Sequence, residues 1–156
     1  MTDNAEKINR MLRSANEFLE ISINNKTYIP NFVNMAFACE LYLKIILQYK
    51  NREYCKGHDL KTLYDEVVKT VDENELLIIL AEEISKNLSF DFCKNNIINA
   101  ECNLQNMFSE HSNLFVEWRY IFDKPIPESG YIVDMTLCSF AKALKKYVET
   151  MIEVVP

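Results

Sequence analysis

The chain has 156 residues, of which 49% are hydrophobic and 26% charged, and its formal charge at pH 7 is −6. This balance is typical of one globular domain over residues 1–156, and the acidic charge argues against a protein that coats nucleic acid through a generally basic surface. Only two glycines and four prolines are present, too few for the many tight turns of a sheet protein, so long helices are favoured.

The first helix is expected from apolar residues at helical spacing, whose buried stripe comprises Ile8, Leu12, Ala15, Leu19 and Ile23. Asp3 and Glu6 have the spacing of a capping box at its start. The stretch NNKTYIP interrupts the pattern. A second helix is expected to begin with Pro30 at its first position and to run to about Tyr49.

This second helix is apolar nearly all round, which is typical of a helix in the middle of a bundle. Its one polar stripe consists of Glu40, Lys44 and Gln48, at successive steps of four residues. Glu before Lys at this spacing is the favourable order and contributes about 0.2–0.5 kcal/mol when the pair is exposed.

Four more helices are predicted from capping residues and apolar seams. Asp59 is expected to cap a short helix directly after it, because its carboxylate can accept hydrogen bonds from the first-turn N–H groups. Asp72 and Glu75 repeat the capping-box spacing for the next helix, and a long helix (Cys93 to Ile121) and a last one (Val133 to Val154) follow. We therefore expect an all-α bundle of about five to six helices, without strands.

The five cysteines are odd in number and form no C-x-x-C pair, so a reduced, cytoplasmic protein is expected. The longest apolar run, Met35 to Leu47, is interrupted by charges and too short to span a bilayer, so we expect no membrane association. No glycine-rich phosphate loop is present, and we expect no cofactor. Nor do we expect a metal site, although Cys55 and His58 have ligand-like spacing, because the remaining candidates, Cys102 and His111, lie on different helical turns.

Arg52 and His58 have the spacing of an arginine–histidine ribonuclease motif, in which the histidine is a general acid or base. The competing interpretation is that His58 only belongs to the start of the helix that Asp59 caps. Arg119 leaves two interpretations open as well. It can satisfy carbonyls at a helix end, with Asp123 paired to it at i+4, or present its fork to a phosphate.

Three separated stretches resemble the HEPN superfamily, the "higher eukaryotes and prokaryotes nucleotide-binding" domains. ACELYLKIIL is similar to the family's Ala-x-Glu-x-x-x-Lys helix, matching at Ala38, Glu40 and Lys44. GHDLKTLYDEV is similar to its His-Asp-Leu-x-x-Leu helix start, matching at His58, Asp59, Leu60 and Leu63. WRYIFD resembles the Arg-Tyr-Pro-Asp segment of the non-catalytic branch, without the proline, at Arg119, Tyr120 and, displaced by one residue, Asp123.

The resemblance spans about residues 32–152 and implies a binding or interaction module. HEPN ribonucleases carry Arg-x(4–6)-His near the start of the last helix, and no histidine follows Arg119 in this chain. The family implies a homodimer that binds a nucleotide, RNA or a partner protein in bacterial defence, abortive infection or toxin–antitoxin circuits. The expected ligand-binding residues are Lys44, His58, Arg119 and Tyr120, supported by Glu40, Asp59 and Asp123.

Two other functions remain open from the sequence. One is a metal-independent ribonuclease that uses Arg52 and His58. The other is a purely structural protein-partner module. Convergence of Lys44, His58 and Arg119 on one cleft is the arrangement that the binding hypothesis requires.

Overall fold

The structure is a computed structural model that describes residues 3–24, 28–50, 56–87, 96–111 and 130–153. Within these ranges the chain forms six helices and no strand, which confirms the predicted all-α bundle. The helices are α1 (Asp3–Asn24), α2 (Tyr28–Tyr49), α3 (Leu60–Val67), α4 (Glu73–Asn87), α5 (Asn96–His111) and α7 (Gly130–Glu153).

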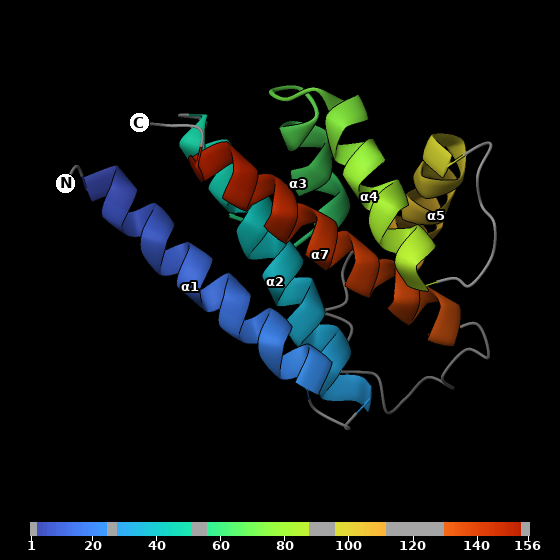
Figure 1. The fold of residues 1–156 in the computed structure, drawn as a ribbon. Coiled ribbons are helices and arrows are strands. Elements are labelled where there is room, and N and C mark those ends of the chain that lie inside the picture. Colours follow the sequence, from blue (N-terminus) through green and yellow to red (C-terminus); the bar gives the residue numbers. More distant parts are fainter. Residues whose placement is uncertain (1–2, 25–27, 51–55, 88–95, 112–129, 154–156) are drawn as a thin grey trace.

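The two longest apolar helices, α2 and α7, run side by side through the middle of the bundle (Figure 1). α1 packs along α2 in the opposite direction, and α3 packs on another side of α2. α4 and α5 cover α7 on the side away from α1. This layout places α2 in contact with three other helices, as its apolar sequence predicts.

The core lies where α2 and α7 meet their neighbours, and it contains almost the whole of α2 between Met35 and Leu47. An aromatic cluster fixes α3 and α5 to α7: the ring centroids of Tyr64 and Phe108 are 5.2 Å apart, and those of Phe108 and Phe140 are 5.7 Å apart. Burial, with the nearby Glu73 carboxylate that accepts the Tyr64 hydroxyl hydrogen bond, raises the pKa of Tyr64. The phenol therefore stays protonated and serves packing.

Two of the predicted capping aspartates accept hydrogen bonds at helix starts. Asp59 Oδ1 accepts a 2.6 Å hydrogen bond from the Thr62 N–H, so Asp59 is the N-cap of α3. Asp72 Oδ1 accepts from the Asn74 N–H at 2.9 Å, immediately before α4. Both residues satisfy N–H groups that a helix start leaves without an intrahelical partner.

Two expectations about the first helices are wrong in detail. Ile23 was expected in the buried stripe of α1 and is 49% exposed, because Ser22 takes the inward position and its hydroxyl donates to the Leu19 carbonyl. α2 begins at Tyr28 rather than at Pro30. Proline is tolerated throughout the first turn, where its missing N–H is not needed, so it does not fix the exact start.

For the long helix predicted from Cys93 to Ile121, the structure describes α5 alone, and Cys93 and residues 112–121 lie outside the described residues. Inside α5, the seam residues Ala100, Leu104 and Met107 are buried as expected. Among the described residues, no helix combines the length and hydropathy that crossing a membrane requires.

Candidate functional site

The polar stripe of α2 lies inside the protein, so the Glu40–Lys44 pair, whose exposure the sequence left open, is buried. The Glu40 side chain is 8% exposed and the Lys44 side chain 10%, and Lys44 Nζ donates to Glu40 Oε1 at 2.7 Å. The reason is the central position of α2, since α1, α3 and α7 all pack against it. A charge on such a helix must be paired, because burying a lone ion is expensive.

His58 completes this cluster from outside α2. Its Nδ1 lies 3.0 Å from Glu40 Oε2 and 3.1 Å from Glu40 Oε1, so one carboxylate holds both a lysine and an imidazole. The His58 side chain is 43% exposed, whereas its two partners are almost covered. We call Glu40, Lys44 and His58 the Glu40 cluster.

The position of His58 follows from the residue after it. Because Asp59 caps α3 and α3 packs on α2, the preceding residue is delivered beside the middle of α2. The cap and the Glu40 contact therefore fix the same short segment at two successive residues. His58 directly precedes the cap of α3 and also contacts Glu40, and the interpretation of His58 as part of the helix start alone does not account for this contact.

The stripe continues one turn further, where it meets α1. Gln48 Nε2 donates to Asn4 Oδ1 at 2.6 Å, and Lys7 Nζ donates to Gln48 Oε1 at 2.8 Å. Gln48 is therefore a structural contact between helices. The charged groups of the stripe, Glu40 and Lys44, lie towards its other end.

The Glu40 cluster can orient an imidazole through the Glu40 carboxylate, whose charge Lys44 balances. A carboxylate against Nδ1 fixes the ring plane, so acid–base or hydrogen-bond chemistry of His58 would use Nε2. The Lys44 side chain is too deeply buried to contact a large ligand directly, so such a ligand would first contact the exposed edge of His58.

Of the predicted site residues, the structure brings Lys44 and His58 together at Glu40, while Asp59, the next residue after His58, caps α3. The others, Arg52, Arg119, Tyr120 and Asp123, lie outside the described residues. Two of the four expected ligand-binding residues, Lys44 and His58, therefore meet at Glu40, although they come from two segments that are separate in the sequence.

The adjacent carboxylates Glu82 and Glu83 of α4 lie in different surroundings. Glu82 is exposed, and its Oε2 accepts a 2.7 Å hydrogen bond from Lys146 of α7, which lowers the pKa of Glu82 and raises that of Lys146. Glu83 is buried and pairs with Lys86.

The described residues contain no group of three metal-binding side chains. Of the cysteines considered for a metal site, Cys102 is exposed on α5 and Cys55 lies outside the described ranges.

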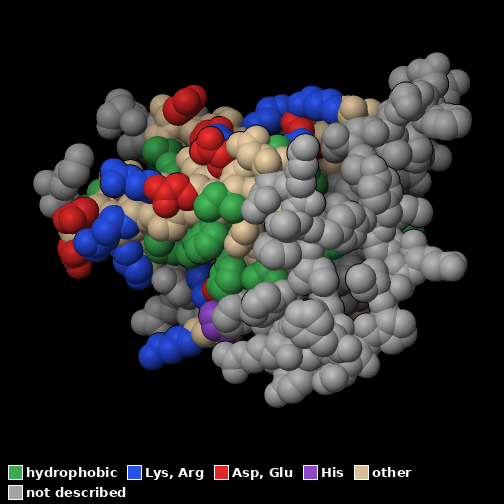
Figure 2. All heavy atoms as spheres, turned by 90° about the horizontal axis from the view of Figure 1, so that it is seen from below, with side chains coloured by type: hydrophobic (Ala, Val, Ile, Leu, Met, Phe, Trp, Pro, Cys, Tyr) green, Lys and Arg blue, Asp and Glu red, His purple; other side chains and the backbone are tan. Residues whose placement is uncertain are grey.

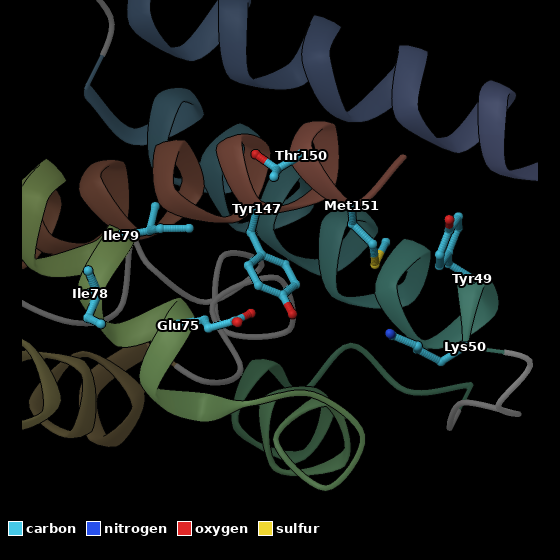
Figure 3. Close-up of a pocket in the computed structure, with 8 residues that line it drawn as sticks. All are labelled: Tyr49, Lys50, Glu75, Ile78, Ile79, Tyr147, Thr150 and Met151. Atoms are coloured by element: carbon cyan, nitrogen blue, oxygen red, sulfur yellow. The ribbon is translucent and has the colours of Figure 1, made fainter. Parts of the chain in front are cut away.

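A groove that the sequence did not indicate opens between the end of α2, α4 and α7 (Figure 3). The signal available beforehand was small: adjacent Ile78 and Ile79 place one isoleucine outside any single apolar stripe, and Ile78 is 46% exposed. Only the packing of three helices shows that these residues share a hollow with Tyr147 and Met151.

Comparison of the chain with protein-family models, with curated proteins and with solved structures gave no match. The functional argument therefore depends on the residues of this chain and on their geometry.

Proposed function

We propose that the protein is a binding module for a nucleotide or RNA, and not an enzyme, with the exposed edge of His58 as part of its binding surface. The observation that carries the proposal is the convergence of Lys44 and His58 on the buried Glu40 carboxylate. The resemblance to HEPN domains at the same residues is its second support. Bacterial defence or toxin–antitoxin circuits are the biological setting that this resemblance suggests.

The proposed contacts follow the chemistry of each side chain. Protonated His58 donates through Nε2 to a phosphate or base, while Lys44 balances the charge of the Glu40 carboxylate behind it. Arg119 supplies a bidentate fork for phosphate oxygens, and Tyr120 a face on which a base stacks. These last two roles come from the resemblance, and variants of both residues test them directly.

Surface charge supports a small number of phosphate contacts. Figure 2 shows acidic and basic side chains interspersed on the face seen from below, without a broad basic patch among the described residues. Two phosphate contacts to single-stranded RNA predict a slope of about −1.4 in log affinity against log salt concentration. A slope several times steeper would indicate extended electrostatic binding instead.

Fluorescence anisotropy with labelled ATP and labelled short RNAs at low salt tests the proposal. We expect saturable binding by the wild type and about tenfold weaker binding by His58→Ala and Arg119→Ala, as for the loss of one charge-assisted hydrogen bond. Lys69→Ala is the matched control, since Lys69 is exposed in the turn after α3. No binding by the wild type, or unchanged binding by both site variants, rejects the proposal.

One observation favours a second candidate, a metal-independent ribonuclease. A carboxylate against one nitrogen of an exposed histidine is the arrangement that orients a general acid or base. Purified protein with EDTA should then cleave RNA, and His58→Ala and Arg52→Ala should each abolish cleavage. Cleavage that survives His58→Ala excludes this mechanism.

We also propose that the protein is a homodimer, as the HEPN resemblance implies. Sedimentation velocity over a hundredfold range of protein concentration tests this, and a monomer throughout would contradict it. If neither nucleotides nor RNA bind and the site variants only lower stability, the purely structural partner module replaces the binding proposal.

A further inference from the structure

The groove between α2, α4 and α7 is separate from the Glu40 cluster and has a volume of about 670 Å³. Its size lies within the roughly 300–1,000 Å³ typical of small-molecule sites. The residues around it are Tyr49, Lys50, Glu75, Ile78, Ile79, Tyr147, Thr150 and Met151. Seven of them lie on α2, α4 and α7, and Lys50 directly follows α2.

Most of the lining is apolar or aromatic. Ile78 is the most exposed large hydrophobic residue of α4, and Ile79, Tyr147 and Met151 are half-buried beside it. Figure 3 shows the Tyr147 ring projecting from α7 into the space between α4 and the end of α2. A flat or branched apolar body could cover this surface and remove it from water.

Opposite charges stand on the two sides of this apolar surface. Glu75 of α4 and Lys50 at the end of α2 lie on either side of the Tyr147 ring (Figure 3). Within the described ranges neither Lys50 nor Glu75 makes an ion pair, and both are exposed. A ligand that matches them carries a cation at one end and an anion at the other.

The hydroxyl of Tyr147 adds one polar group to the middle of the groove. Burial, with the carboxylates of Glu75 and Asp72, raises the pKa of Tyr147. The phenol is therefore neutral at physiological pH and can donate a hydrogen bond.

We propose that this groove binds a small zwitterionic molecule whose apolar or aromatic body separates an ammonium group from a carboxylate. The ammonium group contacts Glu75, the carboxylate contacts Lys50, and the body packs against Tyr147, Ile78 and Met151. The charge complementarity of the two sides selects this class over a plain hydrophobic ligand, which would leave both charged groups without partners.

Methyl NMR of the full chain, labelled at Ile δ1 and Met ε, tests the proposal with four probes of one shape. The probes are 4-(aminomethyl)benzoate, which is zwitterionic, 4-methylbenzoate, 4-methylbenzylamine and the neutral 4-methylbenzyl alcohol. We expect saturable shifts of the Ile78, Ile79 and Met151 methyl signals, with the Ile8 methyl in α1 as the unaffected reference. The zwitterion should bind about three- to fivefold more tightly than either singly charged probe, as expected for one partly exposed ion pair.

Two variants assign the charges. Lys50→Ala should remove the preference for the zwitterion over the amine, and Glu75→Gln its preference over the benzoate. The controls Lys69→Ala and Glu20→Gln change exposed charges outside the groove and should keep both preferences. Circular dichroism and melting curves establish that every variant is folded.

Four results would overturn the proposal: no saturable shift at these methyls, equal affinity for all four probes, a preference for the zwitterion that survives both substitutions, or methyl shifts that follow protein concentration without any probe. The last result would identify a second copy of the chain as the occupant. None of these variants touches the Glu40 cluster, so the outcome does not depend on the proposed nucleotide or RNA binding.

Discussion

Two ion pairs in this protein have the same length and opposite surroundings. Lys44 Nζ lies 2.7 Å from Glu40 Oε1, and Lys146 Nζ lies 2.7 Å from Glu82 Oε2. The first pair is about one-tenth exposed, whereas the Lys146 and Glu82 side chains are 48% and 52% exposed. Distance alone therefore says little about energy, since burial decides what is lost when one partner is removed.

The positions of the helices explain the contrast. α2 lies at the centre, so its polar stripe is covered by its neighbours, and Glu40 is satisfied by Lys44 and by His58 from the start of α3. The other pair bridges α4 and α7 on the outside of the bundle, where water solvates both groups. The buried pair also fixes the candidate binding surface, while the exposed pair only links two helices.

The largest expected effect is that of Glu40→Ala. It leaves the buried Lys44 ammonium without this counter-ion and removes the His58 contact, so the free energy of unfolding should fall by about 3–5 kcal/mol. Urea unfolding followed by circular dichroism measures this loss. The double variant Glu40→Met with Lys44→Met should recover much of the stability, because it removes both charges and keeps the apolar volume. A loss below about 1 kcal/mol in Glu40→Ala would place the two pairs in the same energetic class.

A smaller effect is expected for the cap that positions His58. Asp59→Ala removes the acceptor of the Thr62 N–H and should lower the free energy of unfolding by about 1 kcal/mol. Asp59→Asn is the control, since an asparagine oxygen caps nearly as well. If the alanine and asparagine variants are equally stable, then the cap does not hold the start of α3, and the Glu40–His58 contact carries that role alone.

The sequence predicted the architecture well, because helix formation here depends on local signals. Asp59 and Asp72 marked helix starts that the structure confirms, and the apolar residues all round α2 indicated its central position. The same distribution of apolar residues should also have indicated that Glu40 and Lys44 are buried. The rule for i, i+4 pairs concerns isolated helices, and it says nothing about the helices that pack on the stripe.

The candidate site was harder to predict, because its contacts are not local. Glu40 and His58 are 18 residues apart, and no spacing rule joins them. The groove at Tyr147 depends on three helices meeting, and Lys50 and Glu75 have no sequence feature that pairs them. Such juxtapositions follow from tertiary packing, whereas caps and stripes follow from a few neighbouring residues.

The smallest expected effect is that of Glu82→Gln, which breaks the exposed pair. Because Lys146 lowers the pKa of Glu82, the pair stabilises the fold above the ordinary glutamate pKa of about 4.3, and this contribution is lost as the pH falls through the lowered value. At neutral pH the variant should therefore melt no more than about two degrees below the wild type. The difference should shrink towards zero in acid and in about 1 M salt, where screening is strong.

Lys146→Gln should lower the melting temperature by a similar amount near neutral pH. Combining it with Glu82→Gln should add little, since both variants remove the same interaction. A difference that grows as the pH falls would mean that Glu82 stabilises the fold in its protonated form, and the contrast with the buried Glu40 pair would then need another cause than solvation.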